Sequence, residues 1–156
     1  MLVKNNKMKF IFTLSLLFIS YFGFAQKLTP TLKEAFKYDD VETLLTELKE
    51  QKATLNDCFD IEGTSYSLFA LSIRMEKPKI FNALITNKAD LNKVCSDKNP
   101  LMYAAKYGQL EMAKALVKAG ADIKLLNKER ETALDYAIKY KNKELETYFL
   151  SLKTTK

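Results

Sequence analysis

Three short segments of the chain repeat one another at nearly regular intervals. Residues 52–56 (KATLN) return as residues 88–92 (KADLN) and again as residues 120–124 (GADIK), at intervals of 36 and 32 residues. A period of this length is typical of repeat arrays, in which each unit buries its apolar face only against its neighbours. The repeat therefore predicts a stack of similar units and argues against a conventional single-core domain.

A second pattern recurs with the same period. In four successive units, a basic residue is followed by a large apolar or aromatic residue. The four pairs are Lys37 and Tyr38, Arg74 and Met75, Lys106 and Tyr107, and Lys139 and Tyr140. A pattern kept through four units points to one structural position that is used repeatedly.

The first 25 residues have the composition of a bacterial export signal. Three lysines precede an almost unbroken apolar run at 10–24, and small residues stand before Gln26, the predicted first residue of the mature chain. The apolar run is shorter than the roughly 20 residues that a permanent membrane span requires. We expect a signal peptide at 1–25, a mature domain at 26–156 without membrane attachment, and a periplasmic or secreted location. Retention of the segment as an N-terminal anchor is the alternative.

The charge of the mature domain is modest. Three of the 25 basic residues and none of the 19 acidic residues lie in 1–25, so cleavage lowers the formal charge from +6 to +3. Nucleic-acid binding requires a concentrated basic face. We therefore expect no nucleic-acid partner.

Cys58 and Cys95 are the only cysteines, and each closely follows one of the repeated segments. They therefore occupy equivalent loops of neighbouring units. Export permits a disulfide between them, but the sequence does not fix the Cα separation that a bridge requires. A disulfide and two separate thiols both remain open.

Capping residues mark the helices of each unit. Asn99 can cap a helix whose first residue is Pro100, where a missing N–H has no consequence. Ser67 and Thr132 occupy the same slot of their units, and Gly120 can end a second helix in a left-handed conformation. Each unit is therefore predicted to fold as a helix–turn–helix followed by a loop, with a larger loop at 56–66.

The third unit resembles an ankyrin repeat. Residues 99–122 read NPLMYAAKYGQLEMAKALVKAGAD, and the family pattern runs TPLHxAA, then GxxE, then paired aliphatic residues and GAD. The fourth unit resembles the pattern well, whereas the first two depart from it further. The resemblance implies an all-α ankyrin-type solenoid with repeats at approximately 29–56, 64–92, 97–124 and 130–152.

The resemblance also implies a binding surface. In ankyrin-like folds the two residues after the Ala-Ala pair end the inner helix and point into a concave groove that grips partners. The predicted partner-binding residues are Lys37, Tyr38, Arg74, Met75, Lys106, Tyr107, Lys139 and Tyr140. Tyrosine and arginine are favoured at binding hot spots. The alternative is structural, because cations at a helix C-terminus are stabilised by the helix dipole.

The residues that catalysis commonly needs are scarce. The chain contains no histidine, and its four glycines form no phosphate-binding loop. The acidic stretch around Asp57, Asp60 and Glu62 does not match the spacing of a calcium-binding loop. We therefore expect no enzyme, no cofactor and no metal site.

Three functions remain. The first is an exported, monomeric protein-binding module whose partner carries an acidic and apolar patch. It would also use the loop tips at 56–66, 93–98 and 124–131. The second is a dedicated inhibitor or immunity-type protein that blocks one toxin or hydrolase, since a rigid scaffold loses little entropy on binding. The third, the weakest because of the modest charge, is binding of an acidic polymer along the basic residues.

Overall fold

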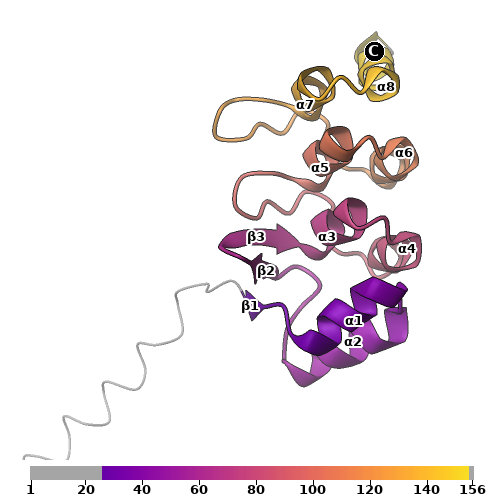
Figure 1. The fold of residues 1–156 in the computed structure, drawn as a ribbon. Helices are drawn as coiled ribbons and strands as arrows, with labels where there is room; N and C mark the ends of the chain where they lie inside the picture. The colour runs from indigo at the N-terminus through magenta and orange to yellow at the C-terminus, as the bar shows by residue number, and fades with distance from the viewer. Residues whose placement is uncertain (1–25, 155–156) are drawn as a thin grey trace, which may run out of the picture.

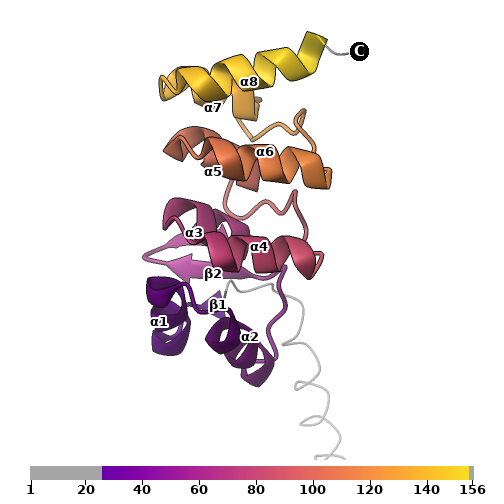
Figure 2. The ribbon, with the colours of Figure 1, turned by 90° about the vertical axis from the view of Figure 1, so that its right-hand side faces the viewer.

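The computed structural model describes residues 26–154, so the predicted export segment at 1–25 lies outside the described residues. Within 26–154, eight helices form four antiparallel pairs that stack in chain order. We call the odd-numbered helices inner and the even-numbered helices outer; in the last three pairs, α3, α5 and α7 form one layer and α4, α6 and α8 the other (Figure 1). Viewed from the outer side, α4, α6 and α8 run nearly parallel (Figure 2).

Each predicted unit contains one helix pair. The pairs are α1 (Pro30–Tyr38) and α2 (Val41–Glu50), α3 (Leu68–Arg74) and α4 (Pro78–Thr86), α5 (Pro100–Tyr107) and α6 (Leu110–Ala119), and α7 (Ala133–Lys139) and α8 (Lys143–Thr154). None of these helices combines the length and apolar character that crossing a bilayer requires.

The inner helices begin at the capping residues that the sequence predicts. The side chains of Ser67, Asn99 and Thr132 each accept a hydrogen bond from the backbone N–H three residues ahead, and Thr29 caps α1 in the same way. The carboxylate of Asp135 accepts a hydrogen bond from the backbone N–H of Thr132, which completes a capping box. Local sequence therefore fixes where each inner helix starts.

Small side chains at one recurring slot let the inner helices approach closely. Ala35, Ser72, Ala104 and Ala137 stand two residues before the basic residue of each pair, and each is at most 1% exposed. The hydroxyl of Ser72 donates to the carbonyl of Phe69 at 2.8 Å, so its burial leaves no polar atom unsatisfied. Larger apolar side chains on both layers then fill one continuous core.

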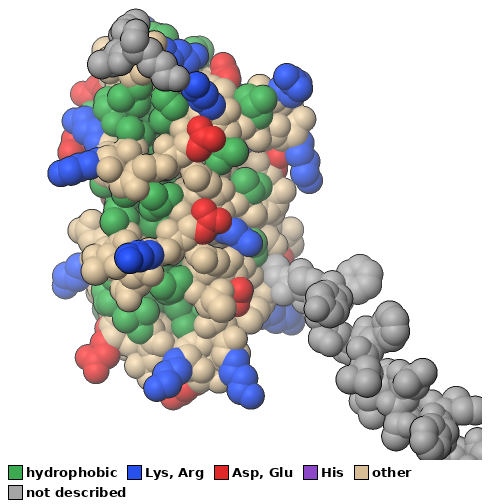
Figure 3. All heavy atoms as spheres, turned by 180° about the vertical axis from the view of Figure 1, so that it is seen from behind, with side chains coloured by type: hydrophobic (Ala, Val, Ile, Leu, Met, Phe, Trp, Pro, Cys, Tyr) green, Lys and Arg blue, Asp and Glu red, His purple; other side chains and the backbone are tan. Residues whose placement is uncertain are grey.

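Polar side chains of the repeated loop segments join neighbouring units. Asn56 Oδ1 accepts from the backbone N–H of Asp90 at 2.7 Å, and Asn92 Oδ1 accepts from that of Asp122 at 2.8 Å. The face behind that of Figure 1 carries acidic side chains along its middle, with hydrophobic patches beside them (Figure 3). The repeated loop segments thus hold one unit to the next.

A three-stranded sheet corrects the all-α prediction. β1 (Gln26–Lys27) pairs in parallel with β2 (Cys58–Ile61), and β2 pairs with β3 (Thr64–Ser67) as an antiparallel hairpin. The hairpin occupies the segment 56–66, for which the sequence predicts only a larger loop. Its two turn residues, Glu62 and Gly63, have φ of 52° and 80°. Two consecutive positive φ angles are typical of the tight turns that match strand twist.

A disulfide joins the hairpin to the next loop. Cys58 in β2 and Cys95 in the loop after α4 are bonded, with their Cα atoms 5.8 Å apart. Beside it, the hydroxyl of Ser96 accepts from the backbone N–H of Ser65 at 2.9 Å and donates to the carbonyl of Ser65 at 3.1 Å. These contacts cover the free edge of β3, so the second and third units are held both covalently and by hydrogen bonds.

Left-handed residues recur after the helices and yield the first prediction. After the outer helices, Lys52, Lys88 and Gly120 have φ of 55°, 56° and 104°. A non-glycine residue in this region is strained by about 1–2 kcal/mol, although glycine adds entropy to the unfolded chain. We expect Lys88→Gly to raise the free energy of unfolding by up to about 1 kcal/mol, measured by urea denaturation.

The equivalent position in the next unit supplies the matched control. A Cβ added at Gly120 would meet nothing within 4 Å, so Gly120→Ala changes only the backbone preference. We expect this variant to lose about 1–2 kcal/mol. Shifts of the same sign in both variants would contradict the explanation by backbone strain.

Removal of the disulfide gives the second prediction. The bridge closes a loop with a sequence separation of 37. A crosslink over such a loop stabilises a protein by about 2–4 kcal/mol. We expect the Cys58→Ser, Cys95→Ser double variant to unfold at a correspondingly lower urea concentration. A reductant should shift the wild type to the same midpoint and leave the variant unaffected; equal midpoints throughout would show that the bridge adds no stability.

Candidate functional site

The eight predicted binding residues all lie where the inner helices end. Tyr38 and Tyr107 are the last residues of α1 and α5, whereas Met75 and Tyr140 cap α3 and α7. Tyr38, Met75 and Tyr140 are exposed, and Tyr107 is half-buried. The recurring pairs therefore do mark one structural position, but their contacts differ from unit to unit.

In the third and fourth units, Lys106 connects two tyrosines. Its ammonium nitrogen lies 5.4 Å from the ring centre of Tyr107 and 5.6 Å from that of Tyr140. A cation within about 6 Å of an aromatic ring is attracted by the electron-rich face of that ring. Lys106 therefore bridges neighbouring units across the surface.

Tyrosine rings extend this contact in both directions. The ring of Tyr103 lies 6.3 Å from that of Tyr107, nearly parallel to it, and 5.6 Å from that of Tyr66 in β3. In the fourth unit, the rings of Tyr136 and Tyr140 stack at 5.9 Å. Ring pairs at these separations attract one another beyond their burial alone.

Further cations complete one connected set of side chains. The guanidinium of Arg74 lies 5.0 Å from the ring centre of Tyr66. The ammonium groups of Lys98 and Lys139 lie 5.9 and 5.5 Å from that of Tyr136. We call this set the tyrosine–cation chain; it comprises Arg74, Tyr66, Tyr103, Tyr107, Lys106, Tyr140, Tyr136, Lys98 and Lys139.

Three predicted residues lie outside this chain. The ammonium of Lys37 lies over the ring of Tyr38 at 4.8 Å and pairs with Glu34 at 3.4 Å, and the backbone carbonyl of Lys37 accepts a hydrogen bond from Lys77 at 3.0 Å. Met75 lies instead in a groove between α1 and α3. Within residues 26–154, the contacts of the first unit therefore do not continue the chain.

Sequence reasoning missed Tyr66, Tyr103, Tyr136 and Lys98. A signal for two of them was present, because Tyr103 and Tyr136 each stand four residues before a predicted tyrosine, a spacing that places both rings on one helix face. Both are only 3% exposed and form the buried part of the chain. Burial also raises the pKa of the Tyr103 phenol, which stays neutral at physiological pH.

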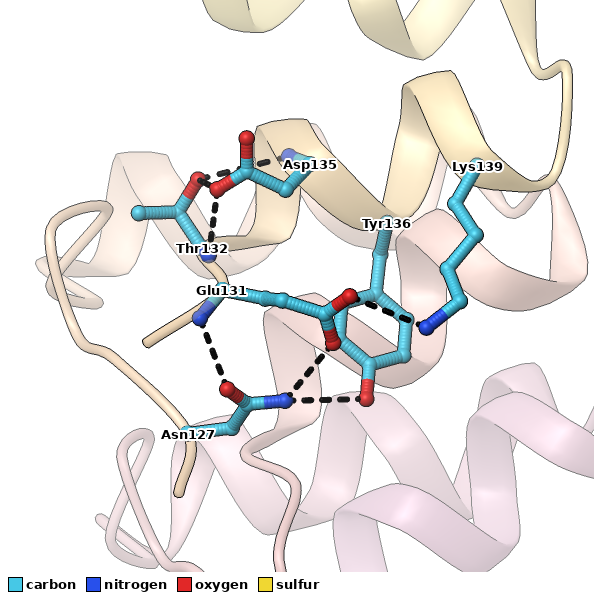
Figure 4. A network of polar contacts seen from close by, with 6 residues as sticks. All are labelled: Asn127, Glu131, Thr132, Asp135, Tyr136 and Lys139. Carbon is cyan, nitrogen blue, oxygen red and sulfur yellow. Dashed lines mark hydrogen bonds and ion pairs between the residues drawn. The ribbon is translucent and has the colours of Figure 1, made fainter. Parts of the chain in front are cut away.

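A polar network fixes the far end of the chain (Figure 4). The side-chain amide of Asn127 donates to the hydroxyl of Tyr136 at 3.2 Å and to the carboxylate of Glu131 at 2.9 Å. Lys139 donates to the other carboxylate oxygen of Glu131 at 2.9 Å. Tyr136 is therefore held in place, and the charge of Lys139 is balanced within the protein.

The other cations of the chain lack such partners. In the described part of the protein, no carboxylate oxygen lies within 4 Å of Arg74, Lys98 or Lys106. Opposite charges satisfy cations at an interface and steer the approach of a partner. The chain therefore presents three positive charges that an acidic ligand could neutralise.

Possible metal-binding side chains do not cluster in the part of the protein that the structure describes. Across 26–154, no group of three or more acidic or cysteine side chains is gathered where it could hold an ion. In the acidic turn, the carboxylate of Asp60 accepts a hydrogen bond from the backbone N–H of Gly63 at 3.2 Å.

Comparison with known proteins agrees with this architecture. The family model for ankyrin repeats (three copies) matches residues 68–155, which is more than half of the chain. A protein of Rickettsia bellii (strain RML369-C), whose name assigns it to the ankyrin repeat proteins, is 34% identical over 98 residues. The alignment covers 56% of this chain and 58% of that relative.

The chain belongs to the ankyrin repeat family. Ankyrin repeats generally mediate protein–protein interaction and are not themselves enzymes. The match begins at Leu68, so it leaves out the first helix pair and the hairpin.

The network at Glu131 yields a prediction about pH. The hydrogen bond from Lys139, and next that from Asn127, lowers the pKa of Glu131 below its usual 4.5. A lowered pKa in the folded state means that the contact stabilises the fold above pH 4.5, and that this stabilisation disappears as the pH falls through the lowered value. We expect carboxyl NMR to show Glu131 titrating below 4.5.

Two substitutions test the cause of this shift. Lys139→Met should return the pKa of Glu131 towards its usual value, because the largest contribution is removed. Lys143→Met removes a lysine that pairs with Glu146 at 2.8 Å and should leave Glu131 unchanged. An unshifted Glu131 in the wild type would contradict the network as described.

Proposed function

We propose that this protein is an exported module that grips a protein partner in the concave groove of its ankyrin stack through the tyrosine–cation chain. The observation that carries the proposal is the run of connected tyrosine rings with three cations that lack carboxylate partners. The partner carries carboxylates and apolar groups side by side. Carboxylates neutralise Arg74, Lys98 and Lys106, and apolar groups cover the accessible rings, which are those of Tyr66, Tyr107 and Tyr140.

Rigidity of the surface supports this function. Tyr103 and Tyr136 are buried, Asn127 fixes Tyr136, and the Cys58–Cys95 bridge ties the hairpin that carries Tyr66 to the next unit. A surface that is ordered before binding loses less conformational freedom on association. The same property suits a dedicated inhibitor of one toxin or hydrolase, which is the alternative.

Two features support export. The segment 1–25 has the composition of an export signal. The disulfide between Cys58 and Cys95 is of the kind that persists in oxidising compartments such as the periplasm or the extracellular space. We propose that the partner is met there.

The experiment is affinity capture with tagged protein expressed from the full chain, followed by mass spectrometry of the bound proteins. The test bait carries Arg74→Glu and Lys106→Glu, which reverse two of the unpaired charges. The control bait carries Lys49→Glu and Lys118→Glu, two exposed lysines on the outer helices α2 and α6. Both baits undergo the same change in net charge, so only the position of the charges differs.

We expect a partner that the wild type and the control bait retain and the test bait loses. Reversal of two interfacial charges should weaken binding by at least tenfold and slow association most at low salt, because like charges then oppose the approach. A subnanomolar affinity for one partner would favour the dedicated inhibitor. Equal capture by both baits would remove the tyrosine–cation chain as the binding surface.

A further inference from the structure

The first helix pair is turned relative to the other three. Whereas α4, α6 and α8 run nearly parallel, α2 runs obliquely and α1 rises steeply towards α3 (Figure 2). Strand pairing and hydrogen bonds help to hold the pair in this position. β1, which leads into α1, pairs with β2 of the hairpin, and the carboxylate of Asp39 accepts from the backbone N–H groups of Lys79 and Ile80 at the start of α4.

This orientation leaves a groove of about 360 Å³ between α1, the hairpin and α3. Its buried part is formed by Leu28 and Leu71, and its accessible apolar wall by Ile61 and Met75. Met75 is 37% exposed, so a ligand in the groove can reach its side chain. A methionine wall adapts to the shape of whatever fills the space, because the side chain is unbranched and polarisable.

The rim of the groove is charged. Lys33 and Arg74 line it with no carboxylate within 4 Å in the described range, and Glu62 is the one acidic residue of the lining. Two cations against one carboxylate favour an anionic neighbour beside the apolar space. Arg74 also contacts Tyr66, so the groove is continuous with the start of the tyrosine–cation chain.

We infer that the groove receives one large apolar side chain, such as Leu or Phe, from an extended acidic segment of the partner. A carboxylate next to this side chain pairs with Arg74 and Lys33, and the segment then continues over Tyr66 towards Lys106. Successive contacts along that route are 5.0 to 6.3 Å long. An extended peptide advances about 3.3 Å per residue, so roughly seven residues cover the stretch from Arg74 to Lys106. This inference rests on the proposed function and adds the apolar anchor and its place.

The test selects random twelve-residue peptides, displayed on phage, against protein made from the full chain. We expect the selected peptides to share one large apolar residue flanked by Asp or Glu. Binding of the synthetic peptides should weaken at least tenfold on Met75→Lys, which places a charge in the groove. It should weaken about threefold on Met75→Ala, which only removes contact area. The matched control is Leu150→Lys, which adds the same charge at a 45% exposed position on α8.

The outcomes separate the groove from the rest of the surface. Peptides that bind Met75→Lys and Met75→Ala as well as the wild type, or a selection that yields no peptide, overturn the inference. If these peptides still lose affinity on Lys106→Glu, the proposed function stands and only the groove fails. If peptide affinity falls on Met75→Lys but not on Lys106→Glu, the result supports the groove as the binding site and contradicts the role of the tyrosine–cation chain. If sedimentation shows a dimer that Met75→Lys abolishes, a second copy of the protein occupies the groove, and the inference of a peptide ligand is wrong.

Discussion

Close contact between the inner helices is the constraint on which the whole array depends. It is possible because Ala35, Ser72, Ala104 and Ala137 place a small, fully packed side chain at the same slot of every unit. A pair of short helices buries too little apolar surface to fold alone, and it becomes stable only when its neighbours cover both sides. The spacing of the surface side chains follows from this packing. Tyr103 and Tyr136 occupy neighbouring units at the same slot, each directly before one of these alanines.

The helices could be predicted from the sequence because the information that sets them is local. Asn99 and Thr132 cap helices through bonds that reach only three residues, and Gly120 ends one through its own backbone preference. The sheet could not be predicted in the same way. β1 is two residues long and pairs with a strand more than 30 residues away, so no local sequence pattern predicts it. Its existence depends on how the first unit docks.

The candidate site also has a part that local sequence predicts and a part that depends on contacts between distant segments. Periodicity placed Lys106 and Tyr140 correctly at the ends of inner helices, because helix position repeats with the unit. It could not show that Lys106 reaches the ring of the next unit, or that Arg74 lies over Tyr66 of the hairpin. These contacts depend on side-chain directions between elements that are distant in sequence. Consequently the tyrosine–cation chain is less regular than the sequence repeat. Its end at Arg74 and Tyr66, which does not follow the repeat, lies beside the groove.

The bond between Cys58 and Cys95 has a mechanical consequence. It encloses α3 and α4, so the whole second helix pair lies inside a covalent ring. A force applied to the two ends of the chain can pull the outer units open, but it can never extend the segment between the two sulfur atoms. A separation of 37 residues at about 3.4 Å each hides roughly 120 Å of contour length from such a force. Under such a force, only the segments before Cys58 and after Cys95 can be extended.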